Sequence, residues 1–206
     1  MNILAFGAHP DDIELGCGGT LIKHQKAGHN VYLCVMSDGK EAGDPEVRRA
    51  EQEEAAKRLK VKELIWGNFE DTRFNVDQHA IRFIENVVTK VRPNEIYLNY
   101  YDDSHQDHRA LAQCIISATR YNKRVLYYED YTSQGFQPDI FVDIEDVLED
   151  KINVMEAFHS QVTRKGPAGL MMLEGIRAIA NFRGFQAKVR YAEGFKAVRY
   201  LKLDIK

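Results

Sequence analysis

The residues best suited to chemistry near the start of the chain form one short polar stretch. His9, Asp11 and Asp12 come directly after the apolar run at residues 3–6, and a glycine cluster (16, 18 and 19) follows them. An apolar run followed by turn residues predicts a buried strand, so these side chains lie on the loop at its carboxyl end. One imidazole and two adjacent carboxylates beside a core strand are typical ligands of a cation. We interpret this loop as half of a zinc site.

A second polar stretch, residues 103–108, has the same position relative to another predicted strand, which ends near Tyr100. If the two strands are neighbours, both loops open at one sheet edge and face one cation. Catalytic zinc usually takes three protein ligands and leaves one position for water. We predict that His9, Asp12 and His108 are those ligands. The side chains left for proton transfer or for hydrogen bonds to the ligands are Asp11, Glu14, His105 and Asp107.

Each loop also has a purely structural interpretation. Pro10 sets a turn, aspartates cap neighbouring backbone, and an Asp-His pair before a helix is a common N-cap. Capping needs one short polar side chain per helix, whereas these two loops carry seven ionisable groups. The two loops taken together therefore favour a functional site.

The rest of the chain predicts the scaffold. Short apolar runs alternate with helical patterns, which favours an α/β, Rossmann-like, three-layer αβα fold with a mostly parallel sheet and the metal site at the strands' carboxyl ends. The expected strands are 2–6, 30–36, 63–66, 95–100, 125–128, 140–144 and 198–203. The expected helices include 20–27 and 45–59. We find no linker or repeat, so we predict one domain over residues 1–206. For residues 161–194 the sequence does not decide between a helix, a lid and an oligomer surface.

Composition narrows the class of protein. The 206 residues carry a net charge of −3, which gives no sign of a nucleic-acid or membrane partner. Three widely spaced cysteines form no CxxC pair, and we expect them to be buried thiols. The chain shows neither a signal-peptide pattern nor an apolar run long enough for a bilayer, so we expect a cytoplasmic protein.

The two polar motifs resemble those of a known family. Residues 8–14 with Gly18-Gly19-Thr20 resemble the signature of the PIG-L/LmbE-like zinc-dependent N-deacetylases, which include bacillithiol- and mycothiol-type GlcNAc deacetylases. Residues 105–108 resemble the second motif, His-Pro-Asp-His, with Gln106 in place of proline. Shorter similarities extend the resemblance over most of the chain: Arg48 and Glu51, and residues 141–144, 158–161 and 191–195.

The resemblance implies a role for each residue. His9, Asp12 and His108 match ligands of one Zn²⁺ per chain, and Asp11 matches the general base. His105 matches a histidine that assists the carbonyl oxygen or the leaving amine, and Asp107 would orient it. Arg48 and Tyr191 match substrate-binding residues. By the same resemblance the substrate is an acetylated amino sugar, and the assembly is a homo-oligomer, a trimer or hexamer.

Other functions stay open at this point. The same site would serve a zinc-dependent hydrolase of another amide or an ester. A non-catalytic nucleotide- or sugar-binding module is a second alternative, although the GxGxxG spacing is absent and Asp11 and Asp12 would repel phosphate. The sequence leaves open the substrate, the acyl group, the metal used in the cell and whether Asp11 or His105 protonates the leaving amine.

Overall fold

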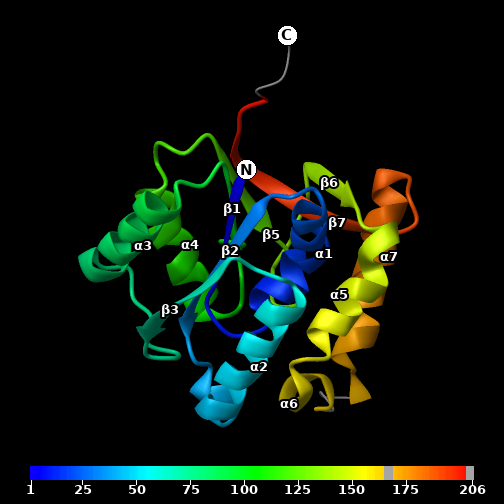
Figure 1. Cartoon of the computed structure of the whole chain (residues 1–206), viewed down its shortest axis with the longest axis horizontal. Helices are drawn as coiled ribbons and strands as arrows, with labels where there is room; N and C mark the ends of the chain where they lie inside the picture. Colours follow the sequence, from blue (N-terminus) through cyan, green and yellow to red (C-terminus); the bar gives the residue numbers. More distant parts are fainter. Residues whose placement is uncertain (165–168, 203–206) are drawn as a thin grey trace.

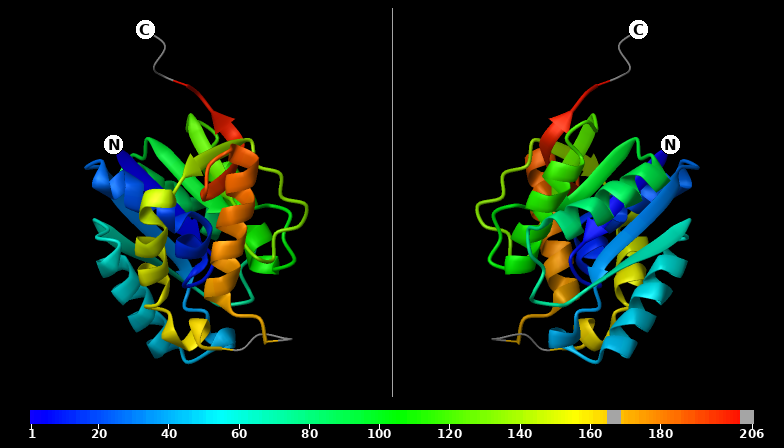
Figure 2. Two further views of the ribbon diagram at one scale, coloured as in Figure 1. Left: turned by 90° about the vertical axis from the view of Figure 1, so that its right-hand side faces the viewer. Right: turned by 90° about the vertical axis from the view of Figure 1, so that its left-hand side faces the viewer.

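The computed structural model describes residues 1–164 and 169–202 and shows a seven-stranded sheet between two layers of helices (Figures 1 and 2). The strands are β1 (Asn2–Gly7), β2 (Asn30–Ser37), β3 (Glu63–Phe69), β4 (Glu95–Asn99), β5 (Arg124–Tyr128), β6 (Ile140–Asp143) and β7 (Ala192–Tyr200). Their spatial order is β3-β2-β1-β4-β5-β7-β6. The first five strands are parallel, and β7 runs antiparallel to both of its neighbours. The predicted mostly parallel αβα fold is confirmed.

The helices divide between the two faces of this sheet. One face carries α1 (Asp12–Lys26), α2 (Pro45–Arg58), α5 (Leu148–Met155) and α7 (Met172–Ala187), and the other carries α3 (Gln78–Val91) and α4 (Gln106–Ala118) (Figure 1). The short helix α6 (His159–Val162) contacts α2 and α7. Two 3-10 turns complete the described elements: η1 (Lys40–Ala42) and η2 (Glu145–Val147). Among these helices none has both the length and the apolar character needed to cross a bilayer.

Two apolar cores hold the layers together, one on each face of the sheet. Alternate residues of a strand point to opposite faces, so Ile3 and Ala5 of β1 join the core under α1 and α5. Leu4 and Phe6 join the core under α3 and α4. All four side chains are fully buried. A strand covered on both faces reads as a continuous apolar run, which is why β1 was recognisable in the sequence.

The first helix begins earlier than predicted. We expected a helix at 20–27, but α1 starts at Asp12 and contains one break, at Cys17 (φ −140°, ψ 15°). Its glycines reflect packing rather than a loop. A Cβ on Gly16 would lie 2.1 Å from the Tyr128 ring, and a Cβ on Gly19 would lie 2.9 Å from Ile144. Gly16 and Gly19 therefore let the helix pack closely against β5 and against the residue that follows β6.

The end of the chain also differs from the prediction. The strand expected at 198–203 is observed as β7, from Ala192 to Tyr200, and Leu203 lies outside the described residues. Pairing with β5 on one side and β6 on the other sets these bounds. The segment 161–194 contains the end of α6, all of α7 and the start of β7, while residues 165–168 are not described.

Candidate metal centre and its cavity

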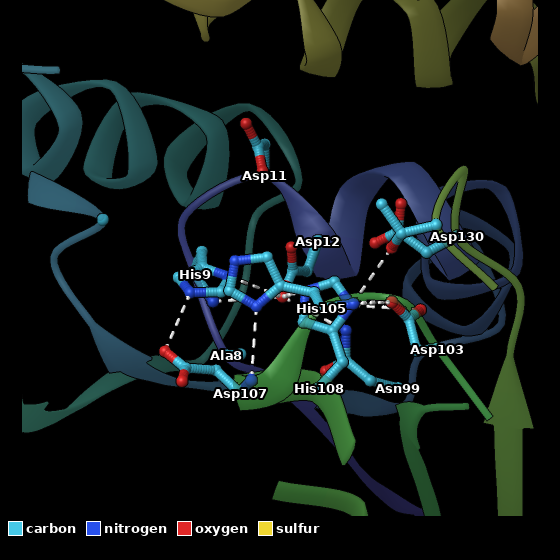
Figure 3. A network of polar contacts seen from close by, with 12 residues as sticks. Ala8, His9, Asp11, Asp12, Asn99, Asp103, His105, Asp107, His108 and Asp130 are labelled. Carbon is cyan, nitrogen blue, oxygen red and sulfur yellow. Dashed lines mark hydrogen bonds and ion pairs between the residues drawn. The ribbon is translucent and has the colours of Figure 1, made fainter. Parts of the chain in front are cut away.

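The sheet order brings the two predicted loops together. β1 lies between β2 and β4 and is parallel to both, so the chain leaves β1 in one direction and returns on the other side at β4. Such a switch point leaves a crevice at the carboxyl ends of the strands. The side chains of both loops meet there (Figure 3).

The three predicted metal ligands meet around one carboxylate oxygen. Asp12 Oδ2 lies 3.3 Å from His108 Nε2 and 3.7 Å from His9 Nδ1. Ligand atoms about 2.0–2.2 Å from a tetrahedral zinc ion are separated from one another by about 3.3–3.6 Å. One nitrogen from each of His9, His105 and His108 also lies within 4.8 Å of the other two. The type and spacing of these donors therefore fit a zinc-sized cation.

Hydrogen bonds hold Asp12 in this position. Asp12 Oδ2 accepts from the backbone N–H of His9 (3.0 Å) and from Asn99 Nδ2 (3.1 Å). The Tyr128 hydroxyl, which has one hydrogen to share, lies within hydrogen-bond distance of two acceptors, Asn99 Oδ1 (2.9 Å) and the carbonyl of Phe6 (2.8 Å). Asn99, at the end of β4, and Tyr128, at the end of β5, therefore orient a predicted ligand. Sequence reasoning gave neither of them a role.

His108 is oriented by a second carboxylate. Asp103 Oδ2 lies 3.2 Å from His108 Nδ1, which leaves Nε2 facing the site. Carboxylates commonly fix metal-binding histidines in this way. Burial lowers the pKa of His108, but the Asp12 charge and the hydrogen bonds that the ring donates to Asp103 and Asp12 outweigh it and raise the pKa to about 10. The raised pKa of His108 shows that the surrounding carboxylates stabilise a positive charge at this position.

His9 contacts two further carboxylates through its other nitrogen. Asp71 Oδ1 lies 3.1 Å and Asp107 Oδ2 lies 3.3 Å from His9 Nε2. Asp107 Oδ2 also accepts from the Thr72 N–H (2.8 Å), and its buried Oδ1 has no hydrogen-bond partner. We expected the Asp107 carboxylate to orient His105. In the structure it contacts His9 instead.

His105 is held by backbone rather than by a carboxylate. It caps α4, and its Nδ1 accepts from the Asp107 N–H (3.2 Å). Burial, followed by the charges of His9 and His108, lowers the pKa of His105. A neutral ring that accepts at Nδ1 carries its proton at Nε2. His105 is therefore a neutral hydrogen-bond donor next to the predicted ligands.

Asp11, the predicted base, occupies a strained turn. Its φ is 92° and its ψ is −27°, a conformation that non-glycine residues rarely adopt and that concentrates at functional sites. Helix α2 holds this turn: Arg48 Nη2 donates to the Pro10 carbonyl (2.6 Å) and lies 3.5 Å from Asp11 Oδ2, and Gln52 Oε1 accepts from the Asp11 N–H (3.2 Å). Burial raises the pKa of Asp11 to about 8 against the opposing charge of Arg48.

A cavity of about 330 Å³ opens over these groups. Loops after all five parallel strands contribute to its wall, as do α6 and the start of α7. Six predicted site residues line it: His9, Asp11, Asp12, Arg48, His105 and His108. Asp107 does not line the cavity itself but contacts His9, which does. Tyr191 does not line it, since its side chain packs partly buried against the core, and Tyr131 occupies the wall instead.

Two acidic residues of the wall received no firm role from the sequence. Asp71 follows β3 and contacts His9, and Asp130 follows β5 and offers an oxygen within 4.8 Å of ligand atoms of Asp12 and His108. Both come two residues after the end of a parallel strand. The loop after the third strand was expected to line the site through Asp71, and the same inspection of the loop after β5 would have found Asp130.

The fold and the site define a Rossmann-like α/β protein with a candidate metal centre at the carboxyl ends of its parallel strands. Comparison with known proteins identifies its family: the sequence profile of the PIG-L family, described as GlcNAc-PI de-N-acetylase, matches residues 4–119. The chain belongs to the PIG-L family, as the two motifs predicted.

Individual relatives agree with this assignment. An uncharacterized deacetylase, YaiS of Escherichia coli, is 34% identical over 152 residues, covering 70% of this chain and 82% of YaiS. The diacetylchitobiose deacetylase of Thermococcus kodakarensis is 30% identical, covering 98% of this chain and 85% of that enzyme. The crystal structure of the conserved protein TT1542 from Thermus thermophilus superposes with a TM-score of 0.88 at 25% identity, covering 99% of this chain and 98% of that one.

Proposed function

We propose that this protein is a zinc-dependent hydrolase that removes the N-acetyl group from an N-acetylglucosamine-type amino sugar. The observation that carries the proposal is the placement of Asp12 Oδ2 between His9 and His108, with Asp11 next to it in the chain and in the same cavity wall. The deacetylases among its relatives support the reaction type. A cavity of about 330 Å³ falls within the range that holds small ligands.

An unactivated amide resists hydrolysis because water is a weak nucleophile and the amine is a poor leaving group. A zinc ion held by His9, Asp12 and His108 would supply Lewis-acid polarisation of the carbonyl and a lower pKa for water. The carboxylate of Asp11 then accepts the proton of the attacking water. Asp11 is adjacent in the chain to the predicted ligand Asp12 and lines the same cavity, so its carboxylate would lie within reach of that water.

The proposed role of His105 is to stabilise the charge that develops on the carbonyl oxygen. Its Nε2–H is free to donate because Nδ1 already accepts from the backbone of Asp107. One such donor typically lowers the barrier by about 3 kcal/mol. The leaving amine needs a proton. Two residues of the cavity wall are candidates to donate it: His105, and Asp11 once it has accepted a proton from water.

Arg48 is proposed to serve both the fold and the substrate. Its Nη2 donates to the Pro10 carbonyl, and its side chain lines the cavity wall. A substrate hydroxyl is a suitable acceptor for its guanidinium group. The predicted contact of Tyr191 with substrate, the trimeric or hexameric assembly and the cytoplasmic location stay predictions.

The nucleotide-binding alternative has less support. Asp11 and Asp12 begin helix α1, where a phosphate group would have to bind. Carboxylates at a helix N-terminus repel phosphate instead of binding it. The metal-dependent hydrolase therefore explains the loop better.

The proposal is tested by acetate release from a panel of N-acetylated amino sugars, assayed with zinc and after removal of metal by a chelator. We expect release that depends on zinc. His108→Ala and Asp12→Ala should lose both bound zinc and activity. An O-acetylated sugar in the same panel separates amidase from esterase. Equal acetate release before and after metal removal would contradict the proposal.

A further inference from the structure

A second cavity lies at the end of the sheet opposite the candidate metal centre. It measures about 450 Å³, and its wall includes the last turn of α1 together with Glu95 and Arg124, the first residues of β4 and β5. The metal centre, in contrast, is built on the loops that follow the carboxyl ends of the parallel strands. Met1 also lines the second cavity, which therefore lies beside the N-terminus marked in Figure 1. Of the described residues none lines both cavities, and we call the second one the distal cavity.

The floor of the distal cavity is apolar. Tyr97 of β4, Leu126 of β5 and Phe195 of β7 lie on the face of the sheet that α1 covers, and all three are almost fully buried. Ile140 and Val142 of the edge strand β6 are half-buried and form a side wall. An apolar surface of this kind binds hydrocarbon by removing it from water. The volume falls within the range of cavities that hold small ligands.

The uncharged polar groups of the wall are engaged with one another. The Tyr97 hydroxyl donates to Glu95 Oε1 at 2.5 Å. Because its one hydrogen is used there, the Tyr97 oxygen accepts from His24 Nε2, 3.2 Å away. His24 Nδ1 lies 2.9 Å from His29 Nδ1, and burial and this neighbour lower the pKa of His24 to about 4, so its ring is neutral at pH 7. These groups offer little to a sugar, which needs several hydrogen bonds.

Two cations and one carboxylate line the distal cavity. The buried guanidinium of Arg124 is held in place: its Nε donates to the Leu201 carbonyl at 3.1 Å, and its Nη1 lies 3.5 Å from Glu95 Oε2. Lys23 pairs at 2.8 Å with Asp146, which lies outside the wall, and such solvent-accessible pairs are weak. The charged side chains of the wall therefore sum to +1, which attracts a monoanion, whereas the Glu95 carboxylate opposes a second negative charge.

We propose that the distal cavity binds a small carboxylic acid with an apolar body. The carboxylate would pair with Lys23 and Arg124, and the hydrocarbon would lie on Leu126 and Phe195. Charge complementarity supports this occupant, because one negative charge matches the net charge of the wall. An inorganic anion, in contrast, would leave the apolar floor unused. The residues involved lie outside the metal centre, so the inference does not depend on the proposed function.

The probe is octanoate, titrated calorimetrically into the full-length protein at pH 7, with butanoate and octanamide for comparison. Each buried methylene group adds to binding, so octanoate should bind about 10- to 100-fold more tightly than butanoate. Octanamide has the same length without the charge and should bind about 10-fold more weakly than octanoate, because hydrogen bonds to charged groups are the stronger ones. A carboxylate can also ligate zinc, so the titrations are run with and without zinc, and the affinity should be the same in both.

Substitutions locate the binding. Lys23→Gln should weaken octanoate binding several-fold, whereas Lys26→Gln should not, because Lys26 forms the same kind of ion pair on the same helix, with Asp150, but lies outside the wall. Val142→Asp places a carboxylate in the apolar side wall and should weaken binding about 10-fold or more. Val142→Asn has the same shape without the charge and should weaken it less. None of these residues lines the catalytic cavity, so zinc-dependent acetate release should stay unchanged, and chemical unfolding verifies that each variant folds.

The outcomes separate this inference from the proposed function. Octanoate affinity that is the same in Lys23→Gln and Val142→Asp as in the unmodified protein would overturn the assignment. Binding that disappears with zinc would also overturn it, because the carboxylate would then lie at the metal centre. Equal binding of octanoate and octanamide would show that the cavity does not select an anion. Octanoate binding in the expected pattern by a protein that releases no acetate from any amino sugar would support this inference and refute the proposed function.

Discussion

Replacement of Asn99 by leucine tests whether the buried hydrogen bonds behind the metal centre set its affinity. Asn99 is fully buried, and its Nδ2 donates to Asp12 Oδ2 at 3.1 Å. Asn99→Leu keeps the approximate volume and removes this donor, so the backbone N–H of His9 is left as the hydrogen-bond donor to Asp12 Oδ2 apart from the predicted ligand side chains. The Tyr128 hydroxyl keeps the Phe6 carbonyl as an acceptor, at 2.8 Å, so no buried donor is left unpaired.

The size of the effect follows from the kind of bond removed. A hydrogen bond to a charged group contributes about 1.5–3 kcal/mol, and loss of a partner behind a metal ligand typically weakens metal binding about 10- to 100-fold. We therefore expect Asn99→Leu to bind zinc about 10- to 100-fold more weakly while the free energy of unfolding of the metal-free protein falls by less than about 2 kcal/mol.

The assay is competition for zinc against a chromophoric chelator, with chemical unfolding of the metal-free protein measured in parallel. Tyr128→Phe is the matched variant: it keeps the bond from Asn99 to Asp12 but removes the hydroxyl that fixes the Asn99 amide. It should weaken zinc binding less than Asn99→Leu does. Zinc affinity of Asn99→Leu within twofold of the unmodified protein would refute this reasoning.

Three further predictions concern the base, the helix packing and pH. Asp11→Asn should retain one zinc ion, measured by elemental analysis, and lose about 10²- to 10⁴-fold in turnover; unchanged turnover would remove Asp11 from the base role. Gly16→Ala should lower the free energy of unfolding by about 1–3 kcal/mol, because its Cβ would lie 2.1 Å from the Tyr128 ring, whereas Gly18→Ala, with its nearest neighbour 3.6 Å away, is the control and should change stability little. Burial and the neighbouring His29 lower the pKa of His24 from 6.5 to about 4, so between these values the unfolded chain takes up a proton that the folded chain does not. Stability should therefore fall by up to about 3 kcal/mol as the pH drops through this range, and urea unfolding at several pH values should show a shallower fall for His24→Gln; identical slopes would contradict the assignment.

The sequence was sufficient for the sheet and for the centre of the site. Strands covered on both faces appear as continuous apolar runs, so β1, β2, β4 and β5 were located almost to the residue. The two histidine motifs each follow such a strand, and strand order at a switch point brings them together. For this reason the grouping of His9, Asp12 and His108 could be predicted without coordinates.

What the sequence could not give is contact between residues distant in the chain. In the sequence Asn99 is recognisable only as the last residue of a strand. Its contacts with Asp12 and with Tyr128 of the neighbouring strand β5 become visible only in the fold. The carboxylate of Asp107 was assigned to His105, two residues away, but the fold places it against His9. Short sequence distance was a poor guide there because a helix N-terminus turns these neighbouring side chains in different directions.

Composition was a poor guide at the glycine cluster, and the late motif has a structural role that the sequence did not indicate. Glycine lowers helix propensity, so residues 16–19 argued for a loop, yet close packing on Tyr128 requires a small residue within the helix. The motif at residues 191–195 suggested a substrate contact by Tyr191. The structure shows a structural role for its glutamate: Glu193 accepts from the N–H groups of Gly19 and Thr20 at 2.8 and 2.7 Å and pairs with the buried Lys151.

The most direct measurement is a titration of metal-free protein with zinc, in which bound zinc and acetate release from an N-acetylated amino sugar are followed together. We predict that activity is absent at the start, rises in proportion to bound zinc and reaches its maximum at one equivalent per chain. Acetate release by the metal-free protein at the full rate, or saturation with zinc without any activity on the amino-sugar panel, would contradict it.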